Sequence, residues 1–156
     1  MELKELYDKF ISEGCNRFSI EGIGEQYFDD IERLEMNNGK WEVSYYERGK
    51  AQEILFSSAD KQDAIRFYHD LVMKIQHWHL VAFTRSFDVF SSYRSRLESH
   101  GIGTIRNDIP GYLSGNDHVY RLFVINNDIL RAKELFEEVP YVDEDIKVYG
   151  GGINNI

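Results

Sequence analysis

The chain has 156 residues with 42% hydrophobic content, so it can bury a core and disorder is not expected. The 27 acidic and 18 basic residues give a formal net charge of −9, which argues against nucleic acid as a direct ligand because phosphate binding relies on Lys and Arg. This charge suits a basic partner or simple solubility. Cys15 is the single cysteine, which excludes an intrachain disulfide framework and a Cys-rich zinc site. Because no apolar run approaches the ~20 residues that span a bilayer and the N-terminus is charged, we expect a cytoplasmic protein with no membrane contact.

The first half of the chain has the pattern of a helix, four strands and a second helix. Apolar residues at helical spacing predict a helix over residues 2–13, and alternation predicts a half-buried strand over 17–21. Residues 30–57 form a predicted β-meander, with turns where Asn and Gly permit positive φ. Ser58 is expected to cap a helix over 59–76, the clearest amphipathic stripe in the sequence.

The second half follows the order β-α-β-β-α-β, which is the ferredoxin-like order. The predicted elements are a buried strand over 80–83, a helix from Ser86 to Gly101, strands over 104–109 and 119–125, a helix from Asn127 or Asp128 to Phe136, and a last strand over 146–149. A long loop is expected over 108–117. The sequence thus predicts an α+β fold with an N-terminal antiparallel β-meander flanked by helices (1–78), packed on a C-terminal ferredoxin-like half (79–156).

Catalytic signatures are mostly missing from the sequence. It has no serine nucleophile elbow, no phosphate-binding loop and no His-Glu-x-x-His zinc motif. Gly22-Ile23-Gly24 lacks the third glycine of a dinucleotide fingerprint. His77 and His79 would share one side of a strand and could hold a metal, but a polar helix-to-strand junction is the favoured interpretation. We therefore expect no enzyme activity, catalytic residue, metal or cofactor.

Carboxylates are densest between residues 21 and 35, where they form either a solvated face or a patch complementary to a basic partner. Tyr46 and Arg48 follow on the aromatic strand and its turn, and are candidate anchors. The predicted partner-binding residues are Glu21, Glu25, Asp29, Asp30, Glu32, Tyr46 and Arg48.

Two stretches resemble known families. The first has a strand with Trp41, then Tyr45-Tyr46-Glu47-Arg48-Gly49, then Phe56-Ser57-Ser58 and a helix with Ala64 and Phe67-Tyr68. It resembles small bacterial immunity proteins that neutralise polymorphic or contact-dependent toxins, many of them nucleases. This resemblance covers about a third of the chain, from Gly39 to Leu71.

The second stretch contains Phe83-Thr84, the run from Tyr93 to Ile102, Arg121-Leu122-Phe123-Val124 and Ala132-Lys133-Glu134-Leu135-Phe136. It is similar to small signal-transducing domains with a PII-like ferredoxin fold. This likeness implies a fold more than a function, and it transfers no catalytic residues.

Three functional hypotheses follow. The first is an immunity protein that covers the active site of a cognate toxin domain with an acidic surface. The second is a regulatory or ligand-sensing ferredoxin-like module whose loop 108–117 closes over its ligand. The third and weakest is a carboxylate-based hydrolase, which needs two facing acids in a pocket. The oligomeric state stays open.

Overall fold

The computed structural model describes residues 1–149, which divide into two compact units, Met1–His77 and the chain from Trp78 onward. Both units combine helices with a four-stranded sheet, so the predicted α+β class is confirmed. None of the helices within residues 1–149 has the length and apolar character required to cross a membrane.

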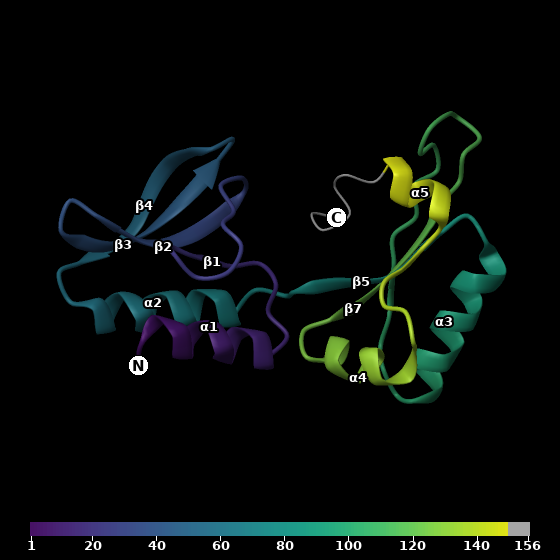
Figure 1. The fold of residues 1–156 in the computed structure, drawn as a ribbon, viewed down its shortest axis with the longest axis horizontal. Coiled ribbons are helices and arrows are strands. Elements are labelled where there is room, and N and C mark those ends of the chain that lie inside the picture. The colour runs from purple at the N-terminus through teal and green to yellow at the C-terminus, as the bar shows by residue number, and fades with distance from the viewer. Residues whose placement is uncertain (150–156) are drawn as a thin grey trace. The chain divides into compact units, whose positions relative to one another are not determined.

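The first unit is a four-stranded sheet with two helices on one face (Figure 1). Its strands lie in the order β1-β2-β3-β4, and both helices contribute side chains to one core. The elements are α1 (Leu3–Ser12), β1 (Ser19–Ile20), β2 (Ile31–Asn37), β3 (Lys40–Glu47), β4 (Lys50–Ser58) and α2 (Lys61–Met73).

The core of this unit follows from strand alternation. Leu34 of β2 lies opposite Val43 of β3, and both are fully buried on the side of the sheet that faces the helices. The amphipathic stripe of α2 supplies Ala64, Ile65, Tyr68 and Val72 to the same cluster. The two hairpin turns have the positive φ angles that the sequence predicts, including Asn38 at 52° and Gly39 at 78°.

Two details of the first unit differ from the sequence predictions. The meander is not wholly antiparallel, because β1 pairs in parallel with β2 after a ten-residue connection, 21–30, returns the chain to the same end of the sheet. The cap of α2 is Asp60, whose carboxylate accepts the N–H of Gln62 at 2.8 Å. Ser58 instead accepts the N–H of Asp60, so the predicted capping residue acts just before the helix.

The second unit has a mixed sheet in the order β6-β7-β5-β8. Its elements are β5 (Trp78–Thr84), α3 (Phe87–Ser99), β6 (Ile105–Arg106), β7 (Tyr120–Ile125), α4 (Asp128–Leu135), β8 (Tyr141–Val142) and α5 (Glu144–Tyr149). Strand β7 is antiparallel to both neighbours, so β5 and β6 run in the same direction with β7 between them. This is the split βαβ arrangement predicted from the element order. Strand β8, however, is parallel to β5.

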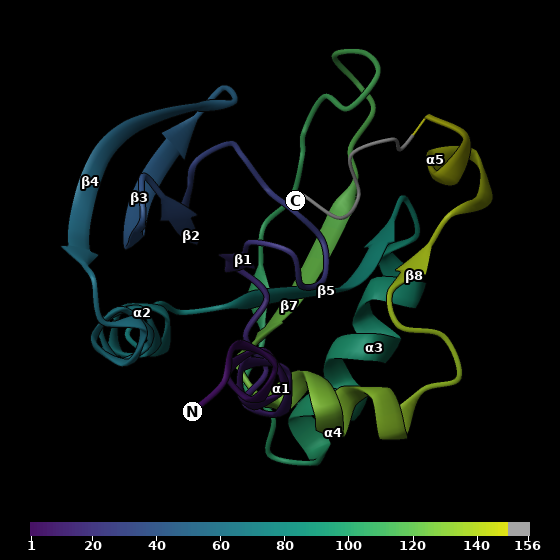
Figure 2. The same ribbon diagram turned by 60° about the vertical axis from the view of Figure 1, so that its left-hand side comes forward.

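The helices of the second unit belong to two separate clusters. Helices α3 and α4 pack together on the sheet through Phe90, Leu97, Ile129 and Ala132. Figure 2 shows α5 apart from this pair, and Ile146 of α5 belongs to another cluster with Phe83, Val119 and Val142.

The predicted last strand over 146–149 is wrong, because these residues belong to α5. Asp143 precedes the helix, and its carbonyl accepts the N–H groups of Ile146 and Lys147. Glu144 and Asp145 occupy the first turn, where carboxylates favour a helix N-terminus. The position of a closing strand is taken by Tyr141–Val142.

Candidate functional site

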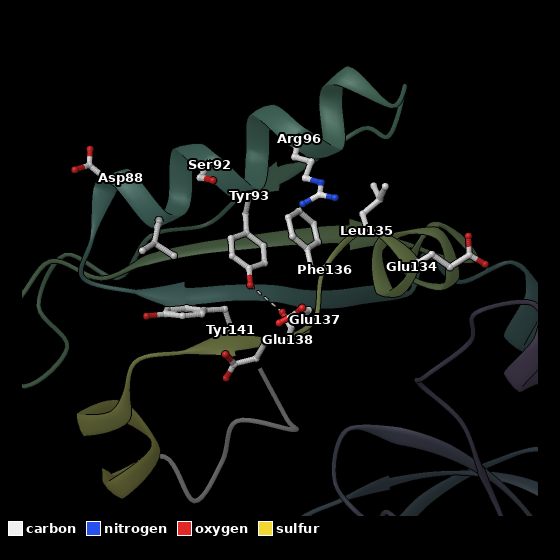
Figure 3. A pocket seen from close by; sticks show the side chains of 11 residues that line it. Asp88, Ser92, Tyr93, Arg96, Glu134, Leu135, Phe136, Glu137, Glu138 and Tyr141 are labelled. Carbon is white, nitrogen blue, oxygen red and sulfur yellow. Dashed lines mark hydrogen bonds between the residues drawn. The ribbon is translucent and has the colours of Figure 1, made fainter.

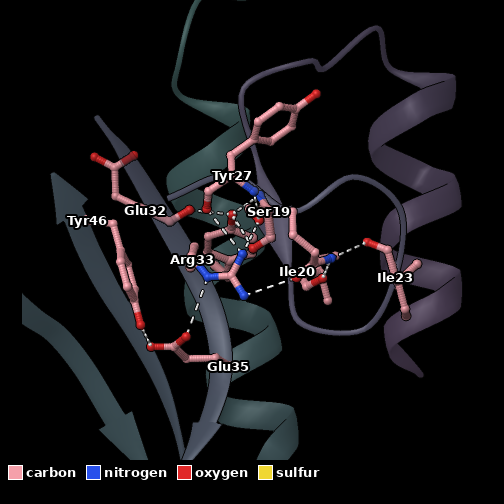
Figure 4. A network of polar contacts seen from close by, with 10 residues as sticks. Ser19, Ile20, Ile23, Tyr27, Glu32, Arg33, Glu35 and Tyr46 are labelled. Carbon is pink, nitrogen blue, oxygen red and sulfur yellow. Dashed lines mark hydrogen bonds and ion pairs between the residues drawn. The ribbon is translucent and has the colours of Figure 1, made fainter. Parts of the chain in front are cut away.

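The acidic connection between β1 and β2, residues 21–30, is attached to the sheet by one buried arginine (Figure 4). The side chain of Arg33 on β2 is only 3% exposed. Its guanidinium donates to Ser19 Oγ at 2.6 Å, to the carbonyl of Tyr27 at 3.1 Å and to Gln26 Oε1 at 3.0 Å. The bonds to Tyr27 and Gln26 hold the connection against the sheet, one through a backbone carbonyl and one through a side chain. We call residues 21–30 the acidic loop.

The charge of Arg33 is balanced by Glu35 on the same face of β2. Arg33 Nε lies 3.4 Å from Glu35 Oε2, and Tyr46 donates its hydroxyl proton to Glu35 Oε1 at 2.5 Å. Burial, together with this bond to a carboxylate, raises the pKa of Tyr46 to about 12, so its hydroxyl stays a neutral donor. The ring of Phe28 lies 4.0 Å from the guanidinium carbon of Arg33. Tyr46, a predicted anchor, is therefore already engaged inside the protein.

A second contact joins the acidic loop to the β3–β4 turn. The carboxylate of Asp29 accepts the backbone N–H of Arg48 at 2.7 Å, and the carbonyl of Phe28 accepts the N–H of Gly49 at 2.8 Å. The structure thus brings together two predicted residues, Asp29 and Arg48. Asp29 holds the turn, and Arg48 is exposed.

The other predicted carboxylates differ in the hydrogen bonds and ion pairs that they form. Asp30 accepts the hydroxyl of Tyr45 at 2.9 Å and lies 3.5 Å from the guanidinium of Arg17, which is also 3.8 Å from Glu32. Glu25 accepts the hydroxyl of Tyr27 at 2.7 Å. The carboxylate of Glu21 is exposed and has no partner within residues 1–149. The acidic loop therefore has exposed carboxylates at Glu21, Glu25, Asp29 and Asp30, and among these four only Glu21 has no partner within residues 1–149.

The seven predicted residues do not share one face of the sheet. In the β2–β3 register Glu32 pairs with Tyr45, and its neighbour Ile31 pairs with Tyr46. Because adjacent side chains of a strand point to opposite faces, Glu32 and Tyr46 lie on opposite sides. Four of the seven residues lie in the acidic loop, namely Glu21, Glu25, Asp29 and Asp30.

The buried charges of the sheet are hidden in the sequence pattern, because Arg33, Glu35 and Glu42 alternate with apolar residues like the solvent-facing positions of a half-buried strand. Arg33 is only 2% exposed, and Glu35 and Glu42 are each 7% exposed. Glu35 and Glu42 lie directly opposite each other, and only knowledge of the strand register would have shown this.

Gly24 has a packing role rather than a nucleotide-binding one. It adopts a φ of 69°, and a Cβ at this position would lie 2.4 Å from the ring of Tyr7 on α1. The glycine therefore permits the close approach of the acidic loop to α1.

His77 is a structural residue at the end of the first unit. It is 2% exposed, and its Nδ1 accepts the N–H groups of Asn16 and Arg17 at 3.1 and 3.0 Å. Its Nε2 lies 3.0 Å from the carbonyl of Val72, which assigns the proton to Nε2. This agrees with the helix-to-strand junction favoured from the sequence.

The burial of His77 predicts a stability change in mild acid. Removal from water lowers the pKa of the imidazole below its ordinary value of 6.5. The unfolded chain then takes up a proton at a pH where the folded site stays neutral, so this contribution is complete above about pH 6.5 and is lost as the pH falls below it. We expect urea unfolding between pH 7.5 and 5.5 to show this loss, and His77→Gln to flatten it. An exposed control, His100→Gln, should leave the slope unchanged; an equal effect of both variants would contradict the assignment.

Cys15 is buried, and desolvation raises the pKa of its thiol to about 11. It is therefore an unreactive thiol at neutral pH. Within residues 1–149 no group of three or more His, Cys, Asp or Glu side chains is placed to hold a metal ion.

The second unit contains a groove of about 770 Å³ between α3 and residues 134–141 (Figure 3). Tyr93 stacks on Phe136 with ring centroids 4.1 Å apart, and its hydroxyl donates to the carbonyl of Glu138 at 2.9 Å. Arg96 lies over Phe136, at 5.3 Å from the ring centroid. Carboxylates line the groove at Asp88, Glu134, Glu137 and Glu138.

The predicted closing loop, 108–117, does not line this groove. It is held at both ends instead, because Arg85 donates to both carboxylate oxygens of Asp117, at 2.6 and 2.9 Å, and Asp108 accepts from Arg106 and lies 2.8 Å from His118 Nε2. In the structure the loop is therefore not part of the groove.

Compared with known proteins, the chain matches no protein-family model, no curated protein and no solved structure.

Proposed function

We propose that the protein is an immunity protein that binds a cognate bacterial toxin domain and covers its active site with the acidic loop. The observation that carries this proposal is the way the loop is built. Its carboxylates at Glu21 and Glu25 face solvent, while its backbone is fixed by the buried guanidinium of Arg33. A surface that is ordered before binding loses little conformational entropy on association, which favours tight binding.

Charge and chemistry support the same proposal. An active site shaped for phosphate is basic, so exposed carboxylates on an inhibitor imitate the charge of the substrate. The exposed ring of Phe28, 43% accessible, lies within the acidic loop and offers an apolar contact beside the charges. The resemblance of residues 39–71 to immunity proteins points in the same direction. Under this proposal the protein needs no catalytic residue or cofactor.

Growth rescue tests the proposal. If the gene upstream encodes a large secreted protein with a toxic C-terminal domain, expression of that domain alone should arrest bacterial growth, and co-expression of this chain should restore it. The purified pair should form a stoichiometric complex. A toxic domain that this chain neither binds nor neutralises would contradict the proposal.

Charge neutralisation tests the mechanism. The double variant Glu21→Gln/Glu25→Gln is expected to slow association with the toxin about tenfold at low salt, because long-range attraction raises the on-rate. The difference should shrink as salt screens the charges. The matched control, Glu134→Gln/Glu137→Gln, removes two charges from the groove of the second unit and should leave the rate unchanged. Stopped-flow fluorescence would measure both rates, and equal rates for the two variants would rule out charge mimicry by the loop.

A second candidate function is favoured by the groove. A regulatory or ligand-sensing module needs a concave site with aromatic and polar lining, and the Tyr93–Phe136 stack with its carboxylate rim has this character. A ligand of this site should raise the melting temperature, and the stabilisation should grow with the logarithm of the ratio of ligand concentration to dissociation constant. The effect should be lost in Glu134→Gln/Glu137→Gln and kept in Glu21→Gln/Glu25→Gln.

A further inference from the structure

The face of the first sheet that points away from α1 and α2 contains more buried negative than positive charge. On β2 this face is formed by Ile31, Arg33 and Glu35, and the register places Tyr46, Ser44 and Glu42 opposite them on β3. Glu35 and Glu42 are direct cross-strand partners, and each is only 7% exposed. Like charges directly opposite each other on neighbouring strands are unfavourable unless a cation balances them.

Only one of these two carboxylates is balanced. Glu35 receives the guanidinium of Arg33 and the hydroxyl of Tyr46. Arg33 directs its remaining donors to Ser19, Tyr27 and Gln26. Glu42 Oε1 is buried and has no hydrogen-bond partner. Lys40, two residues earlier on β3, is exposed and forms no ion pair with Glu42 within residues 1–149.

We propose that Glu42 is the receiving site for one cationic side chain, lysine or arginine, of the protein partner. A buried carboxylate without a partner is costly, and a cation that enters beside it regains both the Coulomb energy and the missing hydrogen bond. This inference rests on the proposed function, which supplies a basic protein partner, and it names the group that the partner inserts.

The surroundings of Glu42 suit a long basic side chain better than a metal ion. Two carboxylates with no third His, Cys, Asp or Glu beside them do not make a metal site in the described chain. Ile54 of β4 pairs with Ser44 on this face and is 57% exposed. Such an apolar side chain can cover the methylene stem of a lysine or arginine while its charged end reaches the carboxylate.

The site can be tested on the isolated full-length protein with a pair of small probes. N-acetyl-arginine amide carries the cation, and N-acetyl-citrulline amide is its neutral analogue. The side-chain carboxyl resonance of Glu35 reports on the neighbourhood of Glu42. We expect saturable shifts with the arginine probe alone, and at least tenfold weaker binding in Glu42→Gln. Glu53→Gln, an exposed position on β4, is the control that should bind like the wild type.

Equal shifts with both probes, undiminished binding in Glu42→Gln, or no shift at all would overturn the site. Thermal unfolding provides a check that Glu42→Gln folds, because removal of an unpaired buried charge should leave its melting temperature equal to or above that of the wild type.

The toxin complex separates this inference from the proposed function. If the toxin binds but Glu42→Gln weakens the complex less than tenfold, the cation site is wrong and the immunity function stands. If no toxin binds but the arginine probe still depends on Glu42, the immunity function is wrong and the site stands.

Discussion

Arg33→Met is expected to lower the free energy of unfolding of the first unit by about 3–5 kcal/mol, the usual cost of removing one partner of a buried ion pair. The substitution leaves Glu35 buried beside Glu42 with no cation, and it removes the bonds to Ser19, Tyr27 and Gln26. Urea unfolding followed by the fluorescence of Trp41, which packs against the first core, would measure the loss. The acidic loop should also become sensitive to proteolysis.

The control for this prediction is Arg48→Met, an exposed arginine in the β3–β4 turn. Surface substitutions of this kind usually change stability by less than about 0.5 kcal/mol. The double variant Arg33→Met/Glu35→Gln should recover part of the loss, because the uncompensated charge of Glu35 is then absent. If Arg33→Met costs no more than Arg48→Met, Arg33 does not hold the loop.

The second large effect is expected for Tyr68→Phe, at about 2–4 kcal/mol of unfolding free energy. The hydroxyl of this fully buried residue accepts the N–H of Ser19 at 2.8 Å and lies 2.7 Å from the carbonyl of Glu32, to which it donates. Phenylalanine keeps the ring and leaves these backbone groups of β1 and β2 unpaired, and each unsatisfied buried group costs about 1–3 kcal/mol. Chemical denaturation and amide exchange at Ser19 would measure the effect.

Tyr45→Phe is the matched control, because its hydroxyl bonds to the carboxylate of Asp30 at the surface. Water replaces that bond, so a loss below about 1 kcal/mol is expected. Equal losses for the two tyrosines would show that Tyr68 does not join α2 to the sheet through its hydroxyl.

Local patterns predict most of the fold correctly. The stripe of α2, the Asn38-Gly39 turn and the β-α-β-β-α-β order of the second unit all depend on residues close together in the sequence. Such signals come from hydrophobic periodicity and from turn-residue preferences, and both can be recognised in a single sequence. The α+β class follows from them.

The sequence predictions fail for features that depend on contacts between residues far apart in the chain. Strand β1 has two residues, and its parallel pairing with β2 is bridged by the hydroxyl of Tyr68, 49 positions away from Ser19. Likewise Arg33 and Glu35 have the alternation of exposed residues, and only the register with β3 and the position of the acidic loop show that they are buried. The buried side chains that hold the acidic loop in place were therefore not predicted from the sequence.

The attachment of the acidic loop has a consequence for how the protein tolerates mutation. Arg33 reaches the loop through the side chain of Gln26 and the backbone carbonyl of Tyr27, and it does not contact the carboxylates of Glu21 or Glu25. The outward side chains can therefore be exchanged without changing what keeps the segment in place. Under the proposed immunity function, a lineage could alter its recognition specificity by single substitutions at these two positions while its scaffold stays intact.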